Sequence, residues 1–198
     1  MKDLVLTPLG LRVAGKVFPC VVGKNGITDL KREGDRKTPI GEHQIVGMLY
    51  RPDRISRPRS WALPIRPRDI WSDDVKDPDY NLMGTSPSSF RYENLFRPDH
   101  LYDLVIITNW NWPYAVKGRG SAIFLHSWRK KGYPTEGCVA LSKDNLFKVD
   151  LNYDNVLNQK LEILESDRAR LQIEKFFKSI KPSIVQRIWR KIIKPLKV

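Results

Sequence analysis

The sequence predicts a mainly β fold, of the β-rich α+β kind, followed by a helical C-terminal extension. Short apolar segments rich in β-branched residues alternate with turn residues through the first 140 residues. Nearly all of the 14 prolines and 12 glycines lie in that stretch, which disfavours a helical bundle. At 198 residues and 41% hydrophobic composition, the chain is long enough for one sizeable core but hardly for two full domains.

The first 50 residues have the pattern of short strands joined by turns. We expect turns at residues 23–26 and 33–39, where glycine, proline and polar residues gather. The strands are expected within 4–7, 11–15, 16–23 and 40–50. Strands that follow one another so closely predict a β-meander.

The middle of the chain divides into an irregular part and an apolar part. Residues 51–79 are rich in Pro, Arg, Asp and Trp and keep neither a helical nor a strand period. We expect one long irregular segment there, which in a compact domain is more often functional than not. Residues 102–110 and 121–126 are apolar almost throughout, which is typical of central strands buried on both faces.

Helical patterns follow this strand region. A short helix is expected over 142–149, with Ser142 as its N-cap and Leu146 and Val149 facing inward. After a last half-buried strand at 160–165, the pattern predicts two amphipathic helices separated by a proline. We therefore divide the chain into a domain at 1–165 and a helical extension at 166–198.

The positive charge is concentrated in the extension. The chain carries a formal net charge of +13, and residues 175–198 contain eight basic residues and no acidic one. Because the body is only mildly basic, a nucleic-acid partner is not favoured. Apolar residues beside the basic ones fit an interfacial helix on an anionic membrane, and equally a solvated or docked appendage. We expect a monomer.

One histidine and one cysteine could form a nucleophilic pair. An apolar strand ends on His126, a polar loop follows, and Cys138 opens the next apolar stretch behind Gly137. A free thiol, with a pKa of about 8.5, needs a nearby base to become a nucleophile at neutral pH. The amides at Gly137 and Cys138 could bind an oxyanion. From spacing alone, structural roles are an equal alternative: Cys138 as a buried small hydrophobic residue and His126 as a hydrogen-bonded histidine at a strand end.

Cys20 lies in an apolar strand, and we interpret it as a core residue.

The stretch SAIFLHSWRKKGYPTEGCVALS (121–142) resembles the histidine and cysteine motif of the YkuD-type L,D-transpeptidases, in the branch whose cysteine motif reads GCVAL. The resemblance extends to KREGDRKTPIGEHQIVGMLYRPDR (31–54), DPDYN (77–81) and HLYDLVIITNWN (100–111). It covers roughly residues 4–150 in consistent order. It implies a β-sandwich or meander with a short helix after the catalytic cysteine.

The resemblance also implies a reaction and its residues. Cys138 would attack a peptidoglycan stem peptide, His126 would act as base, and Gly137 would belong to the catalytic set. No metal or organic cofactor is implied. Transpeptidation, stem-peptide hydrolysis (an L,D-carboxypeptidase) and a non-catalytic envelope-binding module stay open. The candidate substrate-binding residues are Thr135, Glu136, Arg119, Ser127, Tyr80 and Asn81. A further set could line the groove, although turn formation alone explains it: Gly34, Asp35, Thr38, Pro39 and Gly41.

One departure from the family pattern concerns the substrate carboxylate. The better-known motif has an arginine two residues after the cysteine, where this chain has Ala140. Arg36, Arg119 or Arg129 could replace it, and the sequence does not choose among them. If His126 activates Cys138, the pKa of that thiol should be depressed.

The expected location is the cell envelope or periplasm, because the substrate class lies there. No apolar stretch approaches the roughly 18 to 20 residues of a membrane span, and the start lacks the apolar region of a secretory signal. A cytoplasmic location therefore stays open.

Overall fold

The computed structural model describes residues 4–13, 15–41 and 43–148, and it confirms the mainly β fold class. The expected strand at 160–165, the helices of 166–198, Val149 and the domain boundary after residue 165 lie outside these residues. The described elements are β1 (Leu4–Thr7), β2 (Gly10–Val13), β3 (Lys16–Phe18), β4 (Cys20–Val21), β5 (Ile27–Thr28), β6 (Thr38–Pro39), β7 (Ile45–Tyr50), β8 (Leu63–Pro64), β9 (Asp69–Ser72), β10 (Met83–Thr85), β11 (Tyr92–Asn94), β12 (Leu104–Thr108), β13 (Phe124–Ser127), β14 (Val139–Leu141) and α1 (Lys143–Phe147).

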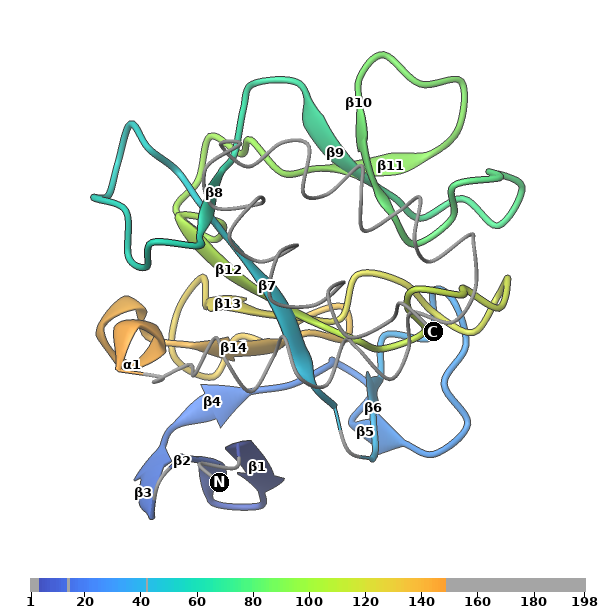
Figure 1. The fold of residues 1–198 in the computed structure, drawn as a ribbon. Coiled ribbons are helices and arrows are strands. Elements are labelled where there is room, and N and C mark those ends of the chain that lie inside the picture. The colour runs from blue at the N-terminus through green and yellow to red at the C-terminus, as the bar shows by residue number, and fades with distance from the viewer. Residues whose placement is uncertain (1–3, 14, 42, 149–198) are drawn as a thin grey trace, which may run out of the picture. The chain divides into compact units, whose positions relative to one another are not determined.

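A six-stranded sheet organises the fold, with the strand order β4-β14-β13-β12-β7-β8 (Figure 1). Strands β13 and β14 run parallel, as do β7 and β8, and the other neighbours are antiparallel. Every residue of β12 and β13 is buried. The expectation that these two apolar segments form central strands is confirmed, because both lie inside the sheet and have neighbours on each side.

Three smaller sheets surround this one. Strands β1, β2 and β3 form an antiparallel meander, as the sequence predicts. The meander ends at Phe18, because β4 and β7 pair into the large sheet instead. Strands β5 and β6 form a short parallel pair, and β9 pairs with both β10 and β11.

The prediction of one irregular segment over 51–79 is wrong in part. The segment contains β8 and also β9, the middle strand of its sheet. All four residues of β9 are buried, although two of them are polar. Asp69 accepts a hydrogen bond from the Arg66 amide at 2.7 Å, and the Ser72 hydroxyl donates to Asp77. Because local partners satisfy these groups, the strand is buried without an apolar pattern that would reveal it.

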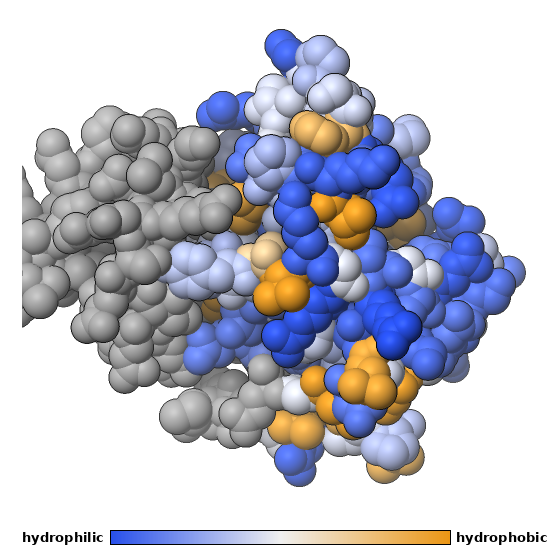
Figure 2. All heavy atoms as spheres, turned by 90° about the vertical axis from the view of Figure 1, so that its right-hand side faces the viewer, coloured by the Kyte–Doolittle hydropathy of each residue, from blue (hydrophilic) through white to orange (hydrophobic). Residues whose placement is uncertain are grey.

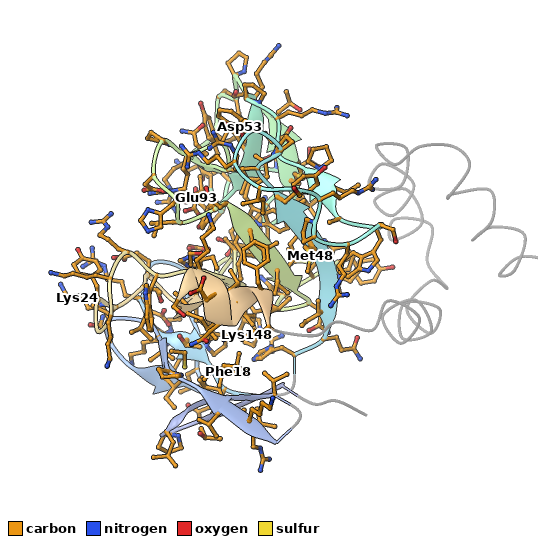
Figure 3. The ribbon with its side chains drawn as sticks, turned by 90° about the vertical axis from the view of Figure 1, so that its left-hand side faces the viewer. Phe18, Lys24, Met48, Asp53, Glu93 and Lys148 are labelled. Atoms are coloured by element: carbon orange, nitrogen blue, oxygen red, sulfur yellow. The ribbon has the colours of Figure 1, made fainter. Side chains whose placement is uncertain are left out.

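The short helix after Cys138 is confirmed. Ser142 caps α1, where its hydroxyl accepts a hydrogen bond from the Asn145 amide at 3.3 Å, and Leu146 is buried. Figure 3 shows α1 from the side, with Lys148 following it. Within the described ranges, no helix has the length and apolar character that a membrane crossing requires.

Three exposed apolar residues lie in and next to the segment that links β5 to β6. Ile27 is 55% exposed, Leu30 75% and Ile40 59%. Figure 2 shows this side of the molecule, on which apolar side chains gather in small groups among hydrophilic ones.

Candidate active site

The strand register places the candidate base and nucleophile on one face of the large sheet. His126 of β13 pairs with Ala140 of β14, and Leu125 pairs with Val139. One step back in the same register, Cys138 lies opposite Phe124, and its Sγ accepts a hydrogen bond from the Phe124 amide at 3.4 Å. Because side chains alternate along a strand, we infer from this register, extended one residue before β14, that Cys138 and His126 share a face. Tyr102 supports this inference, since it packs against His126 and its pKa responds to the charge of Cys138.

A backbone carbonyl defines the proton position on His126. Its Nδ1 lies 2.8 Å from the Ser127 carbonyl oxygen, which can only accept, so Nδ1 carries the hydrogen. In the neutral ring, Nε2 then holds a lone pair and can act as a base. The ring of Tyr102 packs edge-on against the imidazole, with 5.2 Å between centroids. Burial lowers the pKa of His126 to about 4, so the ring is neutral at physiological pH.

The thiol of Cys138 also carries its proton and is neutral. It donates a hydrogen bond to the Ala122 carbonyl oxygen at 3.0 Å. Burial, followed by the negative charge of Glu93, raises the pKa of the thiol to about 12, against the lowering effects of the Phe124 amide and of Lys31. The depressed pKa predicted from the sequence is therefore wrong for this state, because the cost of desolvation exceeds the favourable contacts.

Asn81 positions Ala122, whose carbonyl oxygen accepts the hydrogen bond from the thiol. Its Oδ1 accepts hydrogen bonds from the Ala122 amide at 2.9 Å and from the Trp71 indole at 3.0 Å. Its Nδ2 donates to the carbonyl oxygens of Trp110 and Asn111 at 3.0 and 2.8 Å. All four hydrogen-bonding positions of this buried amide are in use, so Asn81 holds Ala122 in place and is not available to bind a substrate.

Tyr80 is likewise buried and serves the framework of the site. Its hydroxyl donates to a carboxylate oxygen of Glu33, which also accepts from the Ser121 hydroxyl at 2.8 Å. Burial, followed by the hydrogen bond and the negative charge of Glu33, raises the pKa of Tyr80. These contacts connect the segment after β5 to the residue that precedes Ala122.

Thr135 and Thr38 hold the turn at Gly137. The Thr135 hydroxyl donates to the Cys138 carbonyl oxygen at 2.6 Å and accepts from the Gly137 amide at 3.2 Å. The Thr38 hydroxyl donates to the Gly137 carbonyl oxygen at 2.8 Å. Gly137 has φ +145°, and an added Cβ would lie 3.0 Å from the Lys37 carbonyl oxygen, so glycine is required here. The Gly137 amide is thus occupied, which leaves Cys138 as the amide of the pair that can face an oxyanion.

The remaining predicted residues lie at the edges of the site. Glu136 is exposed and pairs with Arg36 at 2.8 Å. The guanidinium groups of Arg119 and Arg129 lie over the rings of Trp110 and Tyr133, at 5.2 and 5.1 Å from their centroids. Each of the three arginines considered for the substrate carboxylate therefore has a partner within the chain.

Ser127 contributes its backbone rather than its hydroxyl. Its side chain points to the opposite face of the sheet from His126, as alternation requires, and is 1% exposed. Its Oγ is buried without a hydrogen-bond partner among the described residues. The carbonyl of the same residue orients the imidazole.

Glu93 is a part of the site that was not identified from the sequence. Glu93, labelled in Figure 3, accepts a hydrogen bond from the Tyr102 hydroxyl at 2.7 Å and pairs with Arg97 at 3.6 Å. Tyr102 in turn contacts His126. Glu93 lies in β11, a strand the sequence did not indicate, so only the register of β9 and β11 could have revealed it.

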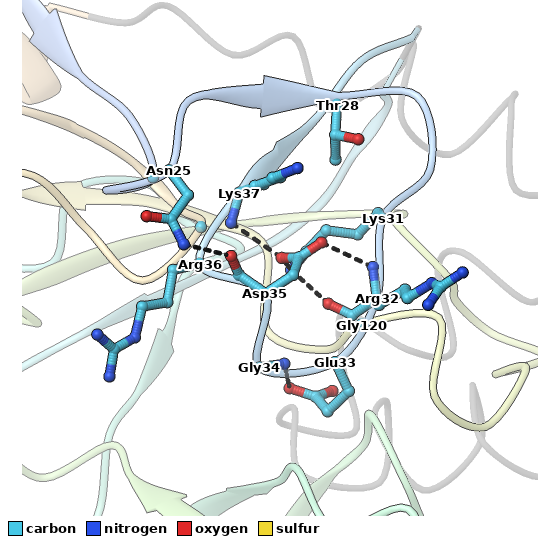
Figure 4. A network of polar contacts seen from close by, with 12 residues as sticks. Asn25, Thr28, Lys31, Arg32, Glu33, Gly34, Asp35, Arg36, Lys37 and Gly120 are labelled. Atoms are coloured by element: carbon cyan, nitrogen blue, oxygen red, sulfur yellow. Dashed lines mark hydrogen bonds and ion pairs between the residues drawn. The ribbon is translucent and has the colours of Figure 1, made fainter.

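The segment 31–37, in which the sequence indicated Gly34 and Asp35 as candidate groove residues, folds around the carboxylate of Asp35 (Figure 4). Asp35 accepts hydrogen bonds from the ammonium of Lys31, from the Arg32 amide at 2.8 Å and from the Lys37 amide at 2.9 Å. Burial alone would raise the pKa of Asp35, but these hydrogen bonds outweigh it and hold the pKa below its ordinary value. Lys31 is 8% exposed, which is unusual for a lysine.

Comparison with protein families assigns the chain to a family. The family model of the L,D-transpeptidase catalytic domain, YkuD, matches residues 10–149. The chain belongs to this family. The match covers well over half of the chain and includes both β13 and β14. Comparison with curated proteins and with solved structures gave no match. The YkuD match supports a catalytic function of the L,D-transpeptidase type, and it does not specify the reaction of this member.

Proposed function

We propose that this YkuD protein is a peptidoglycan L,D-transpeptidase, which cross-links stem peptides through a thioester on Cys138. The observation that carries the proposal is the hydrogen bond between His126 Nδ1 and the Ser127 carbonyl. It leaves Nε2 as a base on the same face of the sheet as Cys138. Family membership supports the reaction class.

His126 and Cys138 are both neutral before the reaction, which suggests the order of proton transfers. Nε2 of His126 takes the thiol proton as Sγ attacks the carbonyl carbon of the third, L-centred residue of the stem peptide. The new carbon–sulfur bond forms, the bond to the terminal D-alanine nitrogen breaks, and His126 returns the proton to that leaving amine. In the second half-reaction, an amine of a neighbouring stem attacks the thioester, gives its proton to His126, and releases the thiol.

Incubation with defined tetrapeptide muropeptides, followed by mass spectrometry, tests this proposal. Transpeptidation should give cross-linked dimers with the loss of one D-alanine for each cross-link. Tripeptides without dimers would instead identify an L,D-carboxypeptidase, in which water resolves the same thioester. Unchanged muropeptides would contradict the enzymatic proposal and favour a non-catalytic envelope-binding module.

The class of substrate implies that the proposed activity takes place in the cell envelope.

Contact of residues 166–198 with an anionic membrane remains a separate prediction, since these residues lie outside the described ranges. Juxtaposed basic residues contribute about 1 kcal/mol each near an anionic surface, and salt screens that contribution. Vesicle binding should therefore fall steeply with ionic strength.

A further inference from the structure

The oxyanion site of the proposed acyl transfer is incomplete if it consists of backbone amides alone. The Gly137 amide is hydrogen-bonded to Thr135. The Cys138 amide has no hydrogen-bond acceptor among residues 4–13, 15–41 and 43–148. A tetrahedral intermediate usually receives at least two donors, so a second donor should lie near Cys138.

A buried ammonium lies next to this turn. An added Cβ on Gly137 would lie 3.7 Å from Lys31 Nζ, so Nζ is within about 5 Å of Gly137 Cα, one residue from the nucleophile. The aliphatic part of Lys31 passes along Gly120, where an added Cβ would lie 3.0 Å from both Cγ and Cε. Glycine at position 120 therefore leaves room for the lysine side chain to reach the site.

The hydrogen bonds of Lys31 leave one donor free. Nζ donates to Asp35 and to the Arg32 carbonyl oxygen, the latter at 2.9 Å. An ammonium carries three protons, so two are held by described residues and one remains. The two bonds also fix the position of Nζ, which a donor to a transition state requires.

We propose that Lys31 is a catalytic residue, whose ammonium binds the oxyanion that forms on the substrate carbonyl together with the Cys138 amide. When Sγ bonds to the carbonyl carbon, the π electron pair moves to the oxygen, and its negative charge lies between these donors. As the intermediate collapses, that pair re-forms the carbonyl and the leaving group departs. This role rests on the proposed acyl-enzyme. A charge-assisted hydrogen bond is roughly twice as strong as a neutral one, so Lys31 is the stronger donor.

The test compares two reactions of the same thiol. Acylation by p-nitrophenyl acetate passes through an oxyanion and releases p-nitrophenolate, whereas alkylation by iodoacetamide displaces iodide without an oxyanion. Both are measured at pH 9 in a Cys20→Ala background, which leaves Cys138 as the one cysteine of the sequence. The neutral ester carries no carboxylate, so binding of a substrate carboxylate does not contribute.

We expect Lys31→Met to lower the ratio of acylation to alkylation rate by about 10²- to 10³-fold, as the loss of one oxyanion donor does elsewhere. Lys31→Gln, which keeps an uncharged donor, should lose less. Arg32→Met, which removes an exposed cation from the same segment, should leave the ratio unchanged. Alkylation of the variants also reports whether the site is folded, since a disrupted site changes both reactions.

Several results would overturn the assignment. An unchanged ratio in Lys31→Met means that the lysine serves only the fold of the segment. A loss seen with a carbapenem but not with the neutral ester means that Lys31 binds a carboxylate. If the unmodified site is alkylated but never acylated, the acyl-enzyme itself fails, and the role of Lys31 fails with it.

Discussion

The strand pair β13–β14 and the segment 31–37 both contribute to the active site, but they place their residues by different means. In the strand pair, backbone register places His126 opposite Ala140, and its extension by one residue before β14 places Cys138 beside Phe124. In the segment, the Asp35 carboxylate accepts hydrogen bonds from two backbone amides and from the Lys31 ammonium, and so places Lys31. Register is supported by every ladder bond of a buried sheet, whereas the ammonium of Lys31 is held by two acceptors, the Asp35 carboxylate and the Arg32 carbonyl oxygen. Mutation of Cys138 or His126 should therefore affect the chemistry directly, whereas mutation of Asp35 should act through the geometry of its segment.

The largest expected effect is at the nucleophile. Cys138→Ala should fold normally, because it removes one sulfur atom from a position fixed by the sheet, yet it should lose all turnover on muropeptides. It should also fail to form a covalent adduct with a carbapenem, which resembles the acyl donor. Intact-mass spectrometry measures the adduct, and circular dichroism checks the fold. Full activity in this variant would exclude a cysteine acyltransferase.

His126→Ala should lower the rate by about 10²- to 10⁴-fold, since general-base catalysis typically contributes that much. The loss should be relieved as pH rises and the thiol ionises without help. Because the folded thiol has its pKa raised to about 12, relief should begin well above pH 8.5. A rate–pH profile of both proteins measures this. If the rate of His126→Ala were fully restored by pH 8, the thiol would not be buried during the reaction.

Asp35→Asn tests how far the carboxylate stabilises the segment 31–37. The free energy of unfolding should fall by about 1–2 kcal/mol, because the carboxylate accepts several hydrogen bonds from groups that would lose their partner. The pKa of Asp35 is lowered on folding, so its contribution is present above the ordinary carboxyl pKa and disappears as pH falls through the folded value. Denaturant titrations should show the two proteins converging in acid. A difference that persists at pH 2 would assign the effect to something other than the charge.

The smallest expected effect is at Glu93, which accepts a hydrogen bond from Tyr102, the residue that packs against His126. Its negative charge raises the pKa of Cys138, after burial. Glu93→Gln removes the charge, while the amide oxygen can still accept from Tyr102, so iodoacetamide should alkylate Cys138 a few-fold faster at fixed pH. Glu93→Asp keeps the charge and is the matched control. Slower alkylation in Glu93→Gln would show that the carboxylate orders the site more than it repels the thiolate.

The same contrast explains what could be predicted from the sequence. Strands β12 and β13 were predictable, because an uninterrupted apolar run identifies a central strand. The cap at Ser142 was predictable, because it depends on local spacing. Strand β9 was not, since its buried polar residues are satisfied by neighbours that only the fold brings close.

The site divides in the same way. The residue motif indicated His126 and Cys138, and the roles assigned to them remain a prediction. The state of the thiol could not be predicted, because burial, which dominates its pKa, is a property of the whole fold. Lys31 was not singled out either, because a lysine in a polar segment normally lies in solvent.

The neutral thiol of Cys138 also has a consequence for chemical attack on this protein. Oxidants and simple alkylating agents react with thiolates, so a thiol with its proton held by Ala122 should resist them in an oxidising environment. Inhibitors that require a preformed thiolate should be weak for the same reason. Compounds that present a carbonyl and allow His126 to remove the proton during attack should be the effective ones, and their selectivity over ordinary surface cysteines should follow from that requirement.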